Sequence, residues 1–353
     1  MKRPKPPASE RAAPSRRRPP LPSLTAPEPR FSGIASFLRR PVHEQGLPAV
    51  DVLLCGAPFD GGTSFRPGAR FGPRAVREAS ALSRSYSQAL GVDIFAELEV
   101  ADGGDVGGSN HDLEQALDAI ASRVAAIAES GALCGLVGGD QTVTLGALRG
   151  LRRAKHKSVG LLHIDSHVNT SPASADDRDL HHGSVIRHAA QEGLIRPDAT
   201  MQLGVRGPYA SADDLAFAIG HGFEVVSTDD VRWDLHAAVS QVRRLAEKGA
   251  LYVSVDVSVL DPACAPGTGF PVPGGLSTWE LQQILRALVG AELAGFDVVE
   301  IAPAYDPAGI TGIVGVTILQ ELLAALADTR RSARPAKSSR GENSARRGKR
   351  LSP

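Results

Sequence analysis

The chain has few of the cysteines on which small disulfide-rich and zinc-ribbon proteins depend. Its 353 residues include 3 cysteines, 2 tryptophans and 2 methionines, and aromatic residues make up 5%. The cysteines, Cys55, Cys134 and Cys264, are far apart and form no CxxC pair. They therefore indicate neither a disulfide framework nor a zinc ribbon. Each lies in or beside an apolar run, as a small core residue does in a reducing compartment, so we expect a cytoplasmic protein.

Long hydrophobic runs are also absent. Nowhere do 18 apolar residues follow one another, and the N-terminus lacks the apolar segment of a secretory signal. Nine prolines within residues 1–30 argue against an amphipathic transit helix. We therefore expect neither a membrane span nor a cleaved targeting segment.

The net charge of zero conceals an uneven distribution. Residues 1–30 hold eight Lys/Arg and two Asp/Glu, and residues 329–353 hold nine and one. The stretch 31–328 is left with 22 basic and 36 acidic residues, a net charge of −14. This pattern predicts one acidic domain at 31–328 between two disordered basic tails. Solvated tails are the more common outcome of such composition, so we do not expect nucleic-acid binding.

Apolar runs and helical periodicities alternate through the acidic domain. Short apolar runs predict buried strands at 50–55, 133–137, 159–164, 201–205, 251–255 and 295–301. Helical patterns occur at about 112–129, 142–153, 183–192, 235–247, 277–290 and 314–327. This alternation predicts an α/β fold with a mostly parallel sheet covered on both faces.

Polar residues follow several of these strands directly. Asp165 and His167 come after the run 159–164, Asp256 after 251–255, and Glu300 lies at the end of 295–301. In open α/β sheets, ligands bind outside the carboxyl ends of the strands. We therefore expect these side chains to gather at one edge of the sheet.

Asp165, His167 and Asp256 form a candidate metal site. Asp165 and His167 are two residues apart and point the same way if the strand continues, while Asp256 arrives from another strand. A lone Asp at a strand end is more often a turn former or helix cap, and a lone His is more often a core residue. Two carboxylates and an imidazole that converge can instead hold a divalent metal with positions left open.

Several motifs resemble those of the ureohydrolases, the family of arginases and agmatinases. They are GAPFDGG at 56–62 with RPGARFGP at 66–73, VGGD at 137–140, HIDSH at 163–167, SVD at 254–256 with DPACAPGTG at 261–269, and DVVEIAPAYDP at 297–307. They occur in order over about 31–328, and the last is similar to the agmatinase form. The resemblance implies a three-layer α/β/α domain with an eight-stranded sheet, assembled into trimers or hexamers.

The resemblance also implies a chemistry. Family members bind two Mn²⁺ ions, which supply a hydroxide that attacks the guanidinium carbon of the substrate and releases urea. Glu300 corresponds to the carboxylate that holds the guanidinium group through charge-assisted hydrogen bonds. His182, in HHGS at 181–184, corresponds to the proton-shuttle histidine. Asp165 corresponds to a metal-bridging acid at the reacting centre.

Three of the family's six metal-ligand positions are changed in this chain. Asp165, His167 and Asp256 keep the family's residue types. The other three positions carry neutral side chains that replace a histidine or a carboxylate: Gln141, Asn169 and Ser258.

Charge limits what the altered centre can hold. Two dications about 3.5 Å apart repel by roughly 19 kcal/mol at an effective dielectric constant of about 20. Four carboxylates offset this repulsion in the family, and two remain here. The three survivors match three of the four ligands of the second ion, and an Asp-x-His with a distant Asp is also the single-metal set of the related deacetylases. We therefore expect one divalent ion, Mn²⁺ or Zn²⁺, rather than two.

Three functions follow as alternatives. The first is an agmatinase-like ureohydrolase that cleaves agmatine or a similar linear guanidino compound with a single-metal site. The second is an inactive paralogue that binds a guanidino ligand, or that assembles with and regulates an active subunit. The third, a single-metal hydrolase of acylated polyamines, rests on the Asp-His-Asp set alone. A homo-oligomer is expected for the first and a hetero-oligomer is possible for the second.

Overall fold

The computed structural model describes residues 29–43, 47, 49–109, 111–154, 157–172, 179–209 and 211–334. The chain divides into two units, residues 1–34 and 35–353. In the first unit, the described residues 29–34 form a turn in which the Ser32 hydroxyl donates to the Pro29 carbonyl. The expected tail at 1–30, and the part of the other tail that follows residue 334, lie almost wholly outside the described residues.

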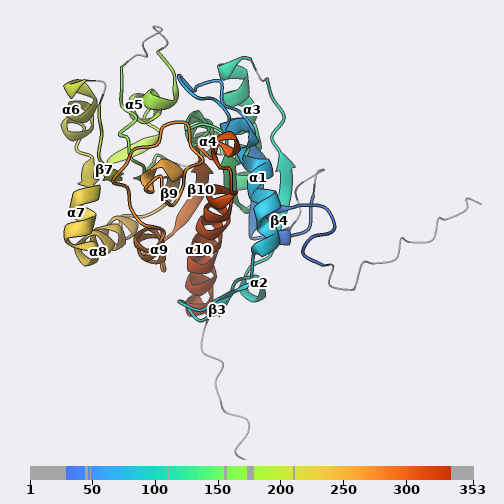
Figure 1. The fold of residues 1–353 in the computed structure, drawn as a ribbon. Coiled ribbons are helices and arrows are strands. Elements are labelled where there is room, and N and C mark those ends of the chain that lie inside the picture. Colours follow the sequence, from blue (N-terminus) through green and yellow to red (C-terminus); the bar gives the residue numbers. More distant parts are fainter. Residues whose placement is uncertain are drawn as a thin grey trace, which may run out of the picture. The chain divides into compact units, whose positions relative to one another are not determined.

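A single eight-stranded sheet organises the second unit (Figure 1). Every strand pair in it is parallel. Its strands run in the order β4-β1-β5-β10-β9-β6-β7-β8. Their bounds are β1 Val52–Ala57, β4 Val100–Asp105, β5 Leu133–Gly138, β6 Val159–Ile164, β7 Ile195–Val205, β8 Glu224–Ser227, β9 Leu251–Asp256 and β10 Leu293–Val299. The parallel α/β sheet predicted from the sequence is confirmed.

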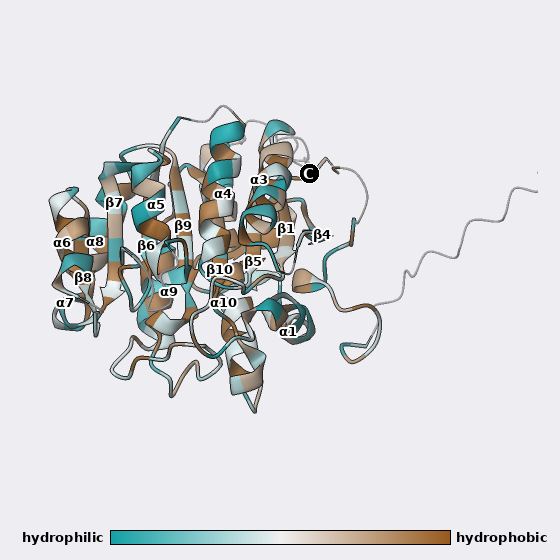
Figure 2. Ribbon diagram, turned by 90° about the horizontal axis from the view of Figure 1, so that it is seen from above, coloured by the Kyte–Doolittle hydropathy of each residue, from teal (hydrophilic) through white to brown (hydrophobic). Residues whose placement is uncertain are grey.

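Helices cover both faces of the sheet, which gives three layers (Figure 2). One face packs against α3 Leu113–Glu129, α4 Thr142–Arg153, α5 Val185–Gln191 and α6 Ala212–Gly220. The opposite face packs against α1 Gly72–Ala79, α7 Thr228–Trp233, α8 Leu235–Ala246, α9 Thr278–Arg286 and α10 Ile310–Ala333. Burial on both faces explains why the central strands are almost entirely apolar instead of alternating.

Smaller elements complete the unit. A two-stranded antiparallel ribbon joins β2 Tyr86–Ser87 to β3 Val92–Asp93, and α2 Ile94–Glu97 follows it. Short 3₁₀ turns lie at Phe37–Arg39, Ala69–Phe71, Ser80–Leu82, His182–Ser184, Val257–Val259 and Pro303–Tyr305.

The long helix α10 is apolar enough to cross a membrane by length and composition alone. However, 67% of its most apolar window is buried within the fold, and α10 packs against α9, α1 and α2. A helix that is buried in the core of a folded protein is normally apolar, so burial explains the composition of α10.

Elements that the sequence patterns missed lie mainly at the margins of the sheet. β4 reads VADGGD and β8 reads EVVS, so neither has an apolar run long enough to stand out. Helices α1, α6 and α7 span only six to nine residues. β7 also begins earlier than predicted, because its polar residues 196–198 continue the strand beyond the apolar run.

The C-terminal boundary needs a correction. Residues 329–333, assigned from the sequence to a disordered tail, continue helix α10. Arg330 forms an ion pair with Asp51, and Arg331 forms one with Asp328. The basic side chains that resembled a solvated tail are therefore partly used to hold the end of a core helix.

Candidate metal centre and active site

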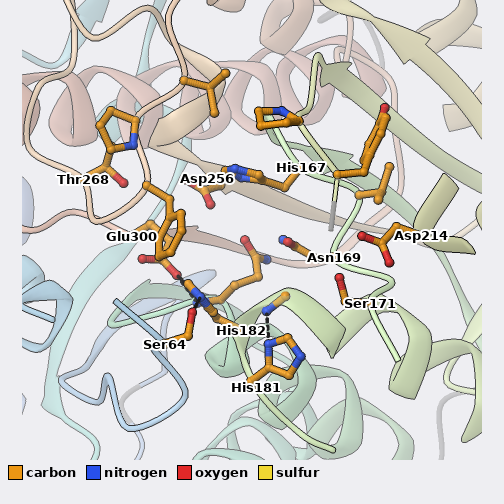
Figure 3. Close-up of a pocket in the computed structure, with 18 residues that line it drawn as sticks. Ser64, His167, Asn169, Ser171, His181, His182, Asp214, Asp256, Thr268 and Glu300 are labelled. Atoms are coloured by element: carbon orange, nitrogen blue, oxygen red, sulfur yellow. Dashed lines mark hydrogen bonds and ion pairs between the residues drawn. The ribbon is translucent and has the colours of Figure 1, made fainter. Parts of the chain in front are cut away.

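The central strands end together and their following loops enclose a cavity of about 380 Å³ (Figure 3). Val299 of β10 is in register with Asp256 of β9, and Val255 is in register with Ile164 of β6. Asp165, Asp256 and Glu300 are therefore delivered to the same edge of the sheet. The strand-end location expected from the sequence is where the structure places them.

Asp165, His167 and Asp256 come together as a candidate metal-binding group. Their potential ligand atoms all lie within 4.8 Å of one another. Both carboxylates are buried, and the His167 side chain is 24% exposed on the cavity side. This is the convergence predicted from the Asp-x-His spacing and the separate Asp256.

Asp165 is surrounded by hydrogen-bond donors. Its Oδ1 accepts from the His167 backbone N–H (2.9 Å) and from the Ser258 hydroxyl (3.0 Å). Its Oδ2 accepts from the Asn169 amide (2.6 Å) and lies 3.1 Å from His163 Nε2. The fully buried His163 was not identified from the sequence, because it precedes the Asp-x-His motif within an apolar strand.

The pKa values of the two acids are shifted in opposite directions. Burial alone would raise the pKa of Asp165, but contacts with His163 and His167 outweigh it and lower the pKa. Burial raises the pKa of Asp256 well above its usual range, and the charges of Asp165 and Glu300 raise it further. The protein thus stabilises one full negative charge here more readily than two.

Two of the replaced ligand positions now contribute donors instead of acceptors. Asn169 and Ser258 each donate to a different oxygen of Asp165. The Ser258 hydroxyl also lies 2.8 Å from that of Ser166, which lies 2.9 Å from His167 Nδ1. Oxygen lone pairs that could have bridged two ions are occupied by this network.

The third replaced position, Gln141, precedes helix α4. Its side-chain Nε2 donates to the Thr144 and Ser254 hydroxyls, both at 2.9 Å. The Thr144 hydroxyl in turn donates to the buried carboxylate of Asp297 (2.8 Å), which also accepts from the Tyr252 hydroxyl. Gln141 lines the cavity and is almost completely buried.

Glu300 and His182 form a pair on the cavity wall. Glu300 Oε1 lies 3.1 Å from His182 Nδ1 and accepts from the Gln141 backbone N–H (3.0 Å). Burial tends to lower the pKa of His182, but the hydrogen bond and charge of Glu300 raise it overall. Glu300 also has φ +64°, which is uncommon for a residue with a side chain and is typical of functional sites.

The other side of the His182 ring is also held. Its Nε2 lies 3.1 Å from the Ser64 hydroxyl, and the Phe270 ring packs against it with centroids 5.2 Å apart. Neither Ser64 nor Phe270 was identified from the sequence. Ser64 is the second residue after the GAPFDGG motif, so its position beside a conspicuous loop was the available signal.

Other acids of the motifs support the loops. Asp60 accepts from the backbone of Gly68 and from Arg70, and Asp140 accepts from the backbone of Gly62 and Thr142. Asp261 accepts from the backbone of 263, 274 and 275. These three acids therefore hold the turns of the motif loops.

Arg206 likewise holds backbone rather than facing the cavity. Its guanidinium group donates to the carbonyls of Ser258, Val259 and Val272. It thereby joins the loop after β9 to the loop that contributes Phe270.

The family model described as the arginase family matches residues 50–325, which include every strand and loop described at this site. The chain belongs to the arginase family. Proclavaminate amidinohydrolase of Streptomyces clavuligerus is 39% identical over 84% of this chain and 94% of that protein. Its structure superimposes with a TM-score of 0.81 over 86% of this chain and 100% of that chain.

Further arginase-family relatives cover the chain similarly. Guanidinopropionase of Pseudomonas aeruginosa is 40% identical over 88% of this chain and 97% of its own length. Mitochondrial agmatinase of Gallus gallus is 36% identical over 83% of this chain and 86% of its own. The similarity therefore extends over the whole domain and not only its motifs.

The residues present fit a divalent ion. Asp165, His167 and Asp256 can supply one ion with mixed oxygen and nitrogen ligands. A second ion would have to draw on Gln141 and Asn169, and the Asn169 amide already donates to Asp165. Among the residues that the structure describes, this is the group of acids and imidazole suited to a metal.

Proposed function

We propose that this chain is an agmatinase-like ureohydrolase that converts a linear guanidino compound to an amine and urea. The observation that carries the proposal is that the Glu300–His182 pair lines the same cavity as His167 and Asp256 of the candidate metal-binding group. A carboxylate for the guanidinium group, a proton carrier and a metal-binding set are thus present together.

Each part of the cavity has a distinct role in the proposed reaction. Asp165, His167 and Asp256 would hold one divalent ion, which would supply Lewis-acid chemistry and would lower the pKa of water toward neutral. Glu300 orients the planar guanidinium group by charge-assisted hydrogen bonds. His182, whose pKa is raised by Glu300, carries a proton that it can deliver to the departing amine nitrogen.

The lining of the cavity favours a substrate with a cationic far end. Among the described lining residues there is no Lys or Arg, whereas Asp214, Asp256 and Glu300 are acidic. Asp214 lies on the opposite side of the cavity from Glu300 (Figure 3). An ammonium group is therefore better matched to this wall than a carboxylate, which supports agmatine over a guanidino acid of similar length.

Urea release from matched substrates tests the proposal. Agmatine and 4-guanidinobutyrate have chains of similar length but end in an ammonium and a carboxylate group. We expect turnover with Mn²⁺ or Zn²⁺ supplied, and a kcat/KM at least about tenfold higher for agmatine. Absence of urea from agmatine, guanidinobutyrate, arginine and guanidine with every metal tried would refute the enzymatic proposal.

A second candidate is a catalytically silent guanidino-binding paralogue. The observation that favours it is the hydrogen bonding of Asp165, whose two oxygens are already supplied with donors by Ser258, Asn169 and the backbone of His167. A metal must compete with these bonds. Agmatine binding without urea release, with no metal retained after dialysis, would favour this candidate, as would co-purification with a subunit that carries all six ligands.

A further inference from the structure

The orientation of the Gln141 side-chain amide is fixed by the residues beneath it. The Thr144 hydroxyl has one hydrogen and donates it to Asp297 Oδ2 (2.8 Å). It can therefore only accept from Gln141, so the group that faces it must be the Nε2 amide nitrogen, at 2.9 Å. Ser254 accepts from the same nitrogen. Both hydrogens of the amide are used inward, away from the cavity.

The amide oxygen is left without a partner. Gln141 Oε1 has no hydrogen-bond partner among the described residues, although Gln141 is only 1% exposed and lines the cavity. A buried acceptor without a donor is costly, and it commonly marks a place where a ligand or ordered water binds.

Other hydrogen-bond acceptors line the same cavity as Gln141. The Gln141 backbone N–H is already bonded to Glu300 Oε1, which places Glu300 beside it. Asp256 and Glu300 line the same cavity and bear carboxylates. A wall of acceptors matches a guanidinium group, which is planar and presents five N–H donors and no acceptor.

We propose that Gln141 Oε1 accepts a hydrogen bond from the guanidinium group of the ligand, beside the carboxylate of Glu300. The inference rests on the proposed function for the class of ligand. In this chain, a position that holds a metal-ligand histidine in the family becomes part of the guanidinium-binding surface. Binding of the guanidinium group at this point then needs no ion.

The test is agmatine binding to the full-length, metal-free protein. Isothermal titration calorimetry in EDTA compares agmatine binding by the unaltered chain with binding by Gln141→Met, which removes the acceptor. Gln202→Met is the matched control, because Gln202 is also fully buried with Oε1 unpartnered among the described residues but does not line the cavity. Melting temperatures confirm that each variant is folded.

The expected result is a dissociation constant for agmatine raised about tenfold or more by Gln141→Met, since one charge-assisted hydrogen bond is lost. For Gln202→Met, the dissociation constant for agmatine should stay within about threefold of that of the unaltered chain. Unchanged binding by Gln141→Met overturns the inference, and so does a lack of agmatine binding by the metal-free unaltered protein. Loss of metal affinity without loss of agmatine affinity overturns it as well, because Gln141 would then be an ion ligand.

Separate urea assays distinguish this inference from the proposed function. Gln141-dependent agmatine binding without urea release leaves the inference standing and refutes the hydrolase. Urea release with a KM that Gln141→Met does not change refutes the inference and leaves the hydrolase in place.

Discussion

Three neutral side chains at the metal centre lower its negative charge and change the direction of its hydrogen bonds. Asn169 and Ser258 donate to Asp165, and Gln141 directs its amide hydrogens toward Thr144 and Ser254. A carboxylate at 169 or 258 would accept where the present residue donates. We therefore propose that the number of ions this site can bind is set by these individual residues and not by the fold.

Restoring those positions should restore a second ion. The variant Gln141→His, Asn169→Asp, Ser258→Asp adds two carboxylates and removes two donors from Asp165. We expect elemental analysis after purification in Mn²⁺ to give about two ions per chain for this variant and at most one for the unaltered chain. Two ions in the unaltered chain would contradict our account of its charge.

His182 is expected to affect turnover more than binding. In His182→Asn the hydrogen bond to Glu300 can persist, but no group of suitable pKa remains to carry a proton. We expect kcat for agmatine to fall about 10²- to 10⁴-fold while KM changes little. If kcat is unchanged, the proton must move by another route.

The raised pKa of His182 also predicts a dependence of stability on pH. Below the ordinary histidine value of 6.5, the charged imidazole interacts with Glu300 and Asp165, and this contribution to stability is lost as pH rises through the raised pKa of His182. Each unit of elevation is worth about 1.4 kcal/mol. The melting-temperature difference between the unaltered chain and His182→Asn should therefore be larger at pH 5.5 than at pH 9. A difference that grows with pH would contradict the assigned direction.

At the level of elements, the site depends on how β5 turns into helix α4. Gly139 donates to the Ala57 carbonyl and accepts from the Glu300 backbone N–H (both 2.8 Å). A Cβ at position 139 would lie 1.4 Å from the Phe59 carbonyl oxygen. The loop after β1, the turn after β5 and the backbone of Glu300 therefore meet at position 139, where only glycine fits.

We expect Gly139→Ala to destabilise the protein by more than about 3 kcal/mol or to prevent folding. Gly220→Ala is the control, because that helical position has nothing within 4 Å of an added Cβ, and alanine there should be neutral or stabilise by about 0.5 kcal/mol. Thermal melts report both. Equal melting temperatures for the two variants would show that the loops can move apart.

The sequence predicted the central elements well, for a physical reason. β5, β6 and β9 are buried on both faces, so their apolar runs stand out, and polar residues mark the point where each strand ends. Asp165, His167, Asp256 and Glu300 could be found from that rule. The sequence could not show that Asn169 donates to Asp165, because that bond depends on which way the amide points. It also could not show the contacts of Ser258 with Asp165 and of Ser64 with His182, because these residues are distant in the chain.

At the level of the whole molecule, assembly stays a prediction. The resemblance to ureohydrolases implies trimers or hexamers, and Trp279 and Ile313 of helices α9 and α10 are partly exposed apolar side chains available for a contact. We expect light scattering to give three or six times the chain mass of 36.9 kDa. A monomeric mass at micromolar concentration would contradict this, and a mixed complex with a second ureohydrolase would support the paralogue candidate.

The hydrogen-bond donors around Asp165 have a consequence for how the proposed metal ion would bind. In a centre built from many acids, removing the cation leaves mutual repulsion that loosens the surrounding loops. Here the Asp165 carboxylate already accepts hydrogen bonds within the protein. Binding of an ion would therefore replace some of these hydrogen bonds with bonds to the metal. Removal of the ion by a chelator should therefore leave the fold unchanged. The fraction of sites with a bound ion should follow the metal concentration, with little effect on the stability of the protein.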